Sequence, residues 1–245
     1  VWWDFGYAAQ YFSHRHTIAD GARHGGPHLY LPAAVYSSED PHFAAQLIKY
    51  TATAREKAAP GAEPRAEETE STADRAGAVF AGLSGEEAQK LVDSWAGSNF
   101  KLSDKDAPQY LVVSFDILRL GYWISNYGSW NFALRESKGF NISSISKALK
   151  YNVDDGMVRV EGRDEVQADS LAILDEKGLK RYSYYRYNDR HFIFNNLSGD
   201  KLALSDGLYN SLLVQLLLSP PDDPRFRKDF QLIFDNVYCR VYRVL

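Results

Sequence analysis

The first residues of the chain combine side chains that could bind a polar ligand. Trp2 and Trp3 precede Asp4, so two indole N–H donors stand beside a carboxylate acceptor. Together these groups can hold one small hydroxyl between aromatic walls. The same residues can equally serve the fold, with Asp4 capping a helix over residues 5–13 and the indoles in the core. Spacing alone leaves both interpretations open.

Four histidines follow in a glycine-rich segment that is typical of a loop. They are His14, His16, His24 and His28. A His-x-His pair on an extended segment places both rings on one face, which suggests a metal ligand pair. No nearby cysteine or carboxylate completes a known ligand spacing, and exposed loop histidines are the alternative. We therefore expect no metal site among the residues of this chain.

Two further groups could carry a function. Ile117, Leu120 and Ile124 recur at the spacing of one helix face, which is typical of a core stripe. Four tyrosines could form a sugar-binding platform, or could be strand aromatics on both faces of a small sheet; they are Tyr182, Tyr184, Tyr185 and Tyr187. The sequence contains no P-loop, GxGxxG, GxSxG or CxxC motif, and no carboxylate pair at an informative spacing.

Composition argues against nucleic-acid binding, an intrachain disulfide and a membrane span in this sequence. The 245 residues carry a net charge of −4, so no basic field points to nucleic acid. The single cysteine, Cys239, cannot form an intrachain disulfide. The longest apolar run, near residues 212–218, is shorter than the roughly 18 residues of a membrane span. No signal peptide is visible.

The first half of the chain contains helix start signals. Asp40 caps a helix within residues 37–54, with Pro41 in its first turn. A capping box begins a helix that runs from residue 84 to about residue 95, and a buried strand is expected at 110–115. Asp116 then caps the helix that carries the Ile117 stripe. Between these elements, residues 55–76 have the composition of a mobile linker or a polar helix.

From about residue 140 the pattern changes to short strands separated by turns. The strand candidates are MVRVE, SLAIL, RYSYYRY, HFIFNN and KLALS. A helix over 207–218 follows, stopped by Pro220 and Pro221, and two strands come last. We expect a mixed α+β fold: an α-rich core that begins at 1–138, a β-rich insertion at 139–205, and a return to the core at 206–245.

The opening segment WWDFGYAAQYFSHRHTIADGARHGG resembles the WWDYG region of oligosaccharyltransferase catalytic subunits, and is most similar to bacterial members of the PglB type. Phe5 stands where the family has tyrosine and lacks its hydroxyl. The resemblance continues through SSEDPHFAAQLI and LYNSLLVQLLL. The helix over 117–124 fits the family pattern MxxIxxx(I/V/W), with Ile117 in place of methionine and Leu120 in place of isoleucine.

The resemblance implies transfer of a glycan from a polyprenyl-diphosphate donor to the asparagine of Asn-X-Ser/Thr. It places the catalytic carboxylates and a divalent metal, Mn or Mg, in a preceding multi-span membrane domain, so this segment alone should be inactive and hold no cofactor. Acceptor binding is implied for Trp2, Trp3, Asp4, Leu120 and Ile117, and donor binding for Tyr7 and His24. The first three would hold the hydroxyl at position +2.

The same resemblance implies the setting. The domain would face the periplasm at a bacterial inner membrane, as a monomer. Its partners would be an Asn-X-Ser/Thr peptide, a lipid-linked oligosaccharide and its own membrane domain, without nucleic acid. The alternative is a stand-alone periplasmic module that binds carbohydrate, peptide or, through its histidine loop, a metal.

Overall fold

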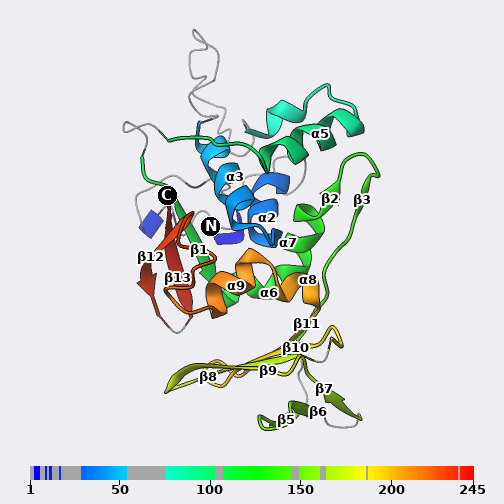
Figure 1. Cartoon of the computed structure of the whole chain (residues 1–245), viewed down its shortest axis with the longest axis vertical. Coiled ribbons are helices and arrows are strands. Elements are labelled where there is room, and N and C mark those ends of the chain that lie inside the picture. Colours follow the sequence, from blue (N-terminus) through cyan, green and yellow to red (C-terminus); the bar gives the residue numbers. More distant parts are fainter. Residues whose placement is uncertain are drawn as a thin grey trace.

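The structure of the protein is a computed structural model that describes residues 3–5, 9, 11–12, 17, 29–53, 76–102, 107–144, 149–160, 164–185, 187–236 and 238–245. It has the expected mixed α+β fold (Figure 1). The helical segments are η1 (Trp3–Phe5), α2 (Tyr30–Ser37), α3 (Pro41–Thr53), η3 (Ala78–Phe80), α5 (Gly85–Trp95), α6 (Phe115–Arg119), α7 (Gly121–Gly128), α8 (Asp206–Tyr209) and α9 (Leu212–Leu218).

The strands follow the same chain order. They are β1 (Tyr110–Ser114), β2 (Trp130–Asn131), β3 (Glu136–Ser137), β4 (Ile142–Ser144), β5 (Leu149–Asn152), β6 (Met157–Val160), β7 (Glu165–Gln167), β8 (Ser170–Asp175), β9 (Gly178–Ser183), β10 (His191–Asn195), β11 (Asp200–Leu204), β12 (Phe230–Asp235) and β13 (Cys239–Val244). Among the described residues, none of the helices has the length and apolar character needed to cross a membrane.

Helix α2 lies in the middle of the helical part, packed against α3, α7 and α9 (Figure 1). Every residue of α2 is buried, so the helix is apolar on all sides. Its contact with α7 is close: a Cβ atom added to Gly128 would collide with the Ser37 hydroxyl and the Ala33 carbonyl. Glycine is therefore required there for the two helices to cross at this distance.

A small sheet closes one side of the helical part. Its strand order is β1-β13-β12, all antiparallel, and Tyr110 of β1 pairs with Arg243 of β13. Leu111 and Val113 turn inward to the helices, while their neighbours on β1 are half-buried. The alternation is that of a strand with one face on a core. The sheet thus joins the middle of the chain to its last strands.

The β-rich segment is built around a five-stranded sheet with the order β4-β11-β10-β8-β9. β8 and β10 run parallel, the other neighbours antiparallel, and both β8 and β10 are buried along their length. One face of the sheet joins the large hydrophobic core of the helices. The other face builds a small second cluster with the β5-β6-β7 sheet, formed by Val158, Ala168, Leu171, Ile173, Phe192 and Phe194.

Several expected helix starts are confirmed. Asp40 Oδ1 accepts from the amides of His42 and Phe43, at 2.8 and 3.3 Å, and caps α3 with Pro41 in its first turn. Ser84 and Glu87 form the expected capping box of α5. These caps succeed because their hydrogen bonds are local and depend on few residues.

Three expectations about element boundaries are wrong. Asp116 lies inside the first turn of α6, and Ser114 is the cap, because its hydroxyl accepts from the Ile117 amide at 3.2 Å. Asp4 likewise lies within η1 and is not a cap that precedes residue 5, although Ala9, Tyr11 and Phe12 are helical, in line with the helix expected over 5–13. The expected strand RYSYYRY ends at Ser183.

The single helix expected over 207–218 is two helices. Ser211 is extended and separates α8 from α9. The break is stabilised from outside, since the Leu212 amide donates to the Ser38 carbonyl at 2.7 Å rather than to a residue of its own helix. The expected linker at 55–76 lies outside the described residues, except for Ala76.

Candidate functional site

The opening aromatic-acidic segment forms the short helix η1. Asp4 is exposed there, and the half-buried Phe5 packs against the large core. Phe5 therefore anchors the segment, while the Asp4 carboxylate is open to a ligand. Trp2, Tyr7 and His24, which the sequence analysis also selected, lie outside the described residues, as do His14, His16 and His28.

The second candidate element is interrupted at its central residue. α6 ends at Arg119 and α7 begins at Gly121, so Leu120 stands between two helices with φ −90° and ψ 7°. This bridge conformation is sparsely populated and recurs in functional sites. Hydrogen bonds continue on both sides, because the Leu120 amide donates to the Ile117 carbonyl and the Ile124 amide to the Leu120 carbonyl, each at 3.0 Å.

The three stripe residues have different surroundings. Ile117 and Ile124 are fully buried, as a core stripe requires, whereas Leu120 is only half-buried. Leu120 and Phe5 pack against the same hydrophobic core. A ligand at this surface would therefore contact Leu120, with Ile117 packed beneath it in the core.

An exposed aromatic pair follows directly on α7. Tyr122 and Trp123 are 44% and 57% exposed, and their rings meet edge-on with centroids 5.3 Å apart. Exposed aromatic surface next to a candidate site is typical of a binding surface. The sequence analysis did not select this pair; a signal was available, because both residues fall between the buried positions of the stripe.

The four tyrosines of the β-rich segment divide into two pairs. Tyr182 and Tyr184 are half-buried against the small cluster, and the Tyr184 hydroxyl donates to the Val153 carbonyl at 2.7 Å. Tyr185 and Tyr187 are 78% and 88% exposed. Tyr182 is the only one of the four inside a strand. At least one pair thus serves packing rather than a shared binding platform.

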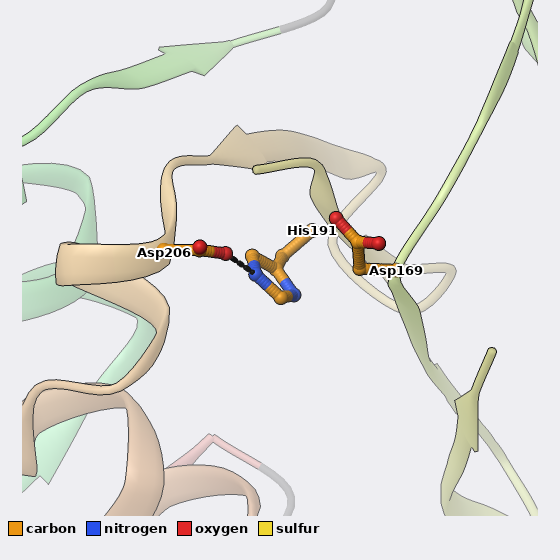
Figure 2. Close-up of side chains that lie close together, drawn as sticks. All are labelled: Asp169, His191 and Asp206. Atoms are coloured by element: carbon orange, nitrogen blue, oxygen red, sulfur yellow. Dashed lines mark hydrogen bonds and ion pairs between the residues drawn. The ribbon is translucent and has the colours of Figure 1, made fainter. Parts of the chain in front are cut away.

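A titratable cluster lies between the five-stranded sheet and α8 (Figure 2). His191 of β10 is buried; its Nε2 lies 2.5 Å from Asp206 Oδ1, and its Nδ1 lies 2.8 Å from the Ser170 hydroxyl. The oxygens of Asp169 accept from the backbone amides of Asn188 and Arg190, at 2.7 to 3.0 Å. No sequence signal selected this group, because Asp169, His191 and Asp206 come from a loop, a strand and a helix that lie apart in the sequence.

The donor set does not fit a metal site. Both ring nitrogens of His191 already have hydrogen-bond partners, and the Asp169 carboxylate is oriented by two backbone amides. A histidine ligand needs one ring nitrogen free for the metal while the other is oriented by a hydrogen bond. The group is therefore a hydrogen-bonded tie between the sheet and α8, with a buried imidazole and an exposed Asp206 carboxylate.

Comparison with known proteins places the chain in a family. Residues 1–134 match the family model described as the STT3/PglB/AglB core domain, so the chain belongs to that family. It carries a domain of the oligosaccharyltransferase type. The matched range includes the Trp3–Phe5 helix and Leu120.

The fold is that of a PglB-like C-terminal domain. The structure is similar to the crystal structure of the C. jejuni PglB C-terminal domain, with a TM-score of 0.63 and 17% sequence identity. The likeness covers 100% of this chain and 92% of that chain, and at this identity it concerns the fold alone. No curated protein matches the sequence.

Proposed function

We propose that this chain is the acceptor-recognition domain of a bacterial oligosaccharyltransferase that transfers a glycan from a polyprenyl-diphosphate donor to the asparagine of Asn-X-Ser/Thr. The observation that carries the proposal is the family match over residues 1–134, which includes both candidate acceptor elements. Such an enzyme is a glycosyltransferase of the bacterial inner membrane. In it this domain faces the periplasm as a monomer beside its own membrane domain.

The acceptor site would have a polar and an apolar part. Trp2, Trp3 and Asp4 bind the hydroxyl of the serine or threonine at +2, and Leu120, supported by Ile117, packs against the threonine methyl group. A site built for a hydroxyl rejects acceptors without one, because its polar groups would be left without partners. Burial of one methyl group favours threonine over serine by about 0.8 kcal/mol.

Two further residues of the proposal would serve donor binding. Tyr7 and His24 are proposed to bind the lipid-linked oligosaccharide, because a histidine can donate hydrogen bonds to diphosphate oxygens. The divalent metal that the family implies, Mn or Mg, would be held by residues of the membrane domain and would supply Lewis-acid chemistry in the full-length enzyme. No residue of this chain is assigned to it, and this chain alone is expected to be inactive.

The β-rich residues 139–205 are proposed as an insertion between the core segments 1–138 and 206–245. Supporting this, Ile193, Leu202 and Leu204 share the large core with the helices, while the small cluster contains six buried residues. Because one face of its sheet packs against the large core of the helices, the insertion is not expected to fold when expressed alone.

The test of the acceptor role is Asp4→Ala in the full-length enzyme, with Trp3→Phe as a second variant. A hydrogen bond to a charged group contributes roughly 1.5–3 kcal/mol, so kcat/KM for an Asn-X-Thr peptide should fall about ten- to a hundred-fold. Because Asp4 is exposed, the thermal midpoint should change little. The matched control is Asp154→Ala, an exposed aspartate in the β5–β6 turn. An Asp4→Ala enzyme that still distinguishes Asn-X-Thr from Asn-X-Val as the parent does would refute the role.

A further inference from the structure

The β-rich segment reaches the helix break at Leu120 directly on one side, and on the other side through α8, the first helix after the segment. Arg119, the residue before Leu120, contacts β11, and Gly121, the residue after it, contacts α8. Leu120 itself has a half-buried side chain and a sparsely populated backbone conformation. A residue in such a conformation keeps it only where the surrounding contacts fix it.

The first link is an ion pair. Arg119 Nη2 lies 2.5 Å from Asp200 Oδ2, and its Nη1 lies 3.0 Å from Asp116 Oδ1. The Ser198 hydroxyl donates to the same oxygen of Asp200 at 2.5 Å. Burial opposes ionisation of Asp200, but Ser198 and Arg119 outweigh it and keep the pKa of this carboxyl below its ordinary value. The carboxylate is thus held charged and in place beside α6.

The second link is a packing contact. A Cβ atom added to Gly121 would lie 3.0 Å from a methyl carbon of Leu208, which is completely buried in α8. Gly207, the preceding residue of α8, lies against the ring of Phe140 in the same way. α8 is therefore wedged against the start of α7, and its position limits where Leu120 can lie.

The hydrogen bond between His191 and Asp206, the first residue of α8, holds this helix to the sheet (Figure 2). The ring of His191 also stacks on Tyr209, the last residue of α8, with centroids 3.9 Å apart and planes 2° from parallel. The Ser170 hydroxyl orients the other ring nitrogen. Asp189 also accepts from the Asp206 amide. One buried imidazole thus contacts both ends of a four-residue helix.

We infer that the His191–Asp206 and Arg119–Asp200 pairs are positioning pairs through which the β-rich segment sets the place of Leu120 in the acceptor site. This inference rests on the proposed function for the role of Leu120, but the mechanical link does not. The pairs act on a ligand only through Leu120, so they tune the preference between threonine and serine acceptors. The β-rich segment is then a specificity element although it contains no acceptor-binding residue.

The link is tested by amide hydrogen exchange on this chain, comparing the parent with Asp206→Ala and Arg119→Gln. The amides of Leu120 and Ile124 donate to the carbonyls of Ile117 and Leu120, one bond on each side of the break, and so report on both of its flanks. Because Asp206 and Arg119 are about half exposed, loss of either pair should speed the exchange of these amides about two- to five-fold. Amides of Leu111 and Val113, in the sheet beyond α6, serve as the reference and should not change.

Two variants sharpen this result. Asp206→Asn keeps an acceptor at the same place and should restore most of the protection. Asp175→Ala removes the exposed Asp175–Lys180 pair elsewhere in the same sheet and should leave Leu120 and Ile124 at the parent rate. Unchanged exchange in Asp206→Ala and Arg119→Gln overturns the link. Equal acceleration at the reference amides also overturns it, because the effect is then global unfolding.

The effect on specificity is measured in the full-length enzyme. One methyl group corresponds to a threonine-to-serine ratio of kcat/KM of about four, which should fall toward one in Asp206→Ala while Asp175→Ala keeps the parent ratio. The change should lie in KM for the threonine peptide rather than in kcat. If exchange at Leu120 accelerates and the ratio stays constant, the mechanical link stands and the acceptor role of Leu120 fails.

Discussion

The two faces of the five-stranded sheet share the same strands but lie against very different cores. Alternate residues of β8 and β10 enter the large core of the helices, and the residues between them enter the small cluster. Ile193 faces the first and Ile173 the second, on neighbouring parallel strands. Strands buried on both faces are normally covered by helices on each side. Here one face of the sheet is covered by helices and the other by a three-stranded sheet. The residues on the two faces are equally buried, but the core behind the second face is much smaller.

The largest expected effect compares the two isoleucines. Ile193→Ala should lower the free energy of unfolding by about 4 kcal/mol, because a large, closely packed core cannot collapse into the cavity. Ile173→Ala should cost about 2 kcal/mol, since the small cluster can relax around it. Urea unfolding of both variants measures the difference. Equal losses, or a larger loss at Ile173, would mean that the two faces are packed to the same depth.

A smaller effect compares two tyrosine hydroxyls with the same bond length. The Tyr36 hydroxyl donates to the Val112 carbonyl and that of Tyr184 to the Val153 carbonyl, both at 2.7 Å. Tyr36 is buried within the large core, whereas Tyr184 is half-buried at the small cluster. Tyr36→Phe should cost about 2 kcal/mol and Tyr184→Phe about 0.5 kcal/mol, because water can replace the second bond. Thermal unfolding of the two variants at one pH measures the difference between the two losses of stability.

The smallest effect belongs to the helical side. His42 Nδ1 of α3 lies 3.0 Å from Asp229 Oδ1, and this hydrogen bond raises the pKa of His42 above its ordinary value of 6.5. The protonated form is thus favoured in the folded state. The stabilisation of the folded state by protonated His42 is complete below pH 6.5, and it is lost as the pH rises through the folded-state pKa of His42.

His42→Gln tests this dependence. Because the imidazole is about half exposed, the thermal midpoint of the variant at pH 5.5 should lie less than about 2 °C below that of the parent. At pH 9 the two midpoints should be equal. Salt should reduce the difference at the lower pH. Ile173→Ala serves as the comparison, since its loss should not depend on pH across this range. A difference in thermal midpoint between His42→Gln and the parent that does not change with pH would contradict the stabilising role of protonated His42.

Local signals predicted much of this fold. Asp40 and Ser84 were identified as caps because each bonds to amides two or three residues further on. The strands β6, β8, β10 and β11 were identified because glycine and asparagine turns separate them. Asp116 was wrongly chosen as a cap over Ser114, since both residue types are good caps and the difference of two positions depends on where β1 ends.

Features set by tertiary contacts could not be predicted. The apolar spacing of Ile117, Leu120 and Ile124 continues across the break at Leu120, so periodicity gives no sign of it. The break at Ser211 depends on the Ser38 carbonyl, which comes from far earlier in the chain. The His191–Asp206 tie joins residues from a strand and a helix, and no short motif contains both. For the candidate site, the sequence analysis selected Asp4 and Leu120, whose acceptor role stays a prediction, and did not select the exposed Tyr122–Trp123 pair.

The pairing of β1 with β13 has a consequence for how the chain is made. β1 leaves the ribosome long before β13, its paired neighbour among the described strands, has been translated. At about 5–20 residues per second, the nascent strand waits on the order of ten seconds without its partner. During that time Leu111 and Val113 present apolar side chains beside unpaired backbone groups. Premature termination within β13 should therefore yield a product that aggregates during synthesis, rather than a folded domain of lower stability.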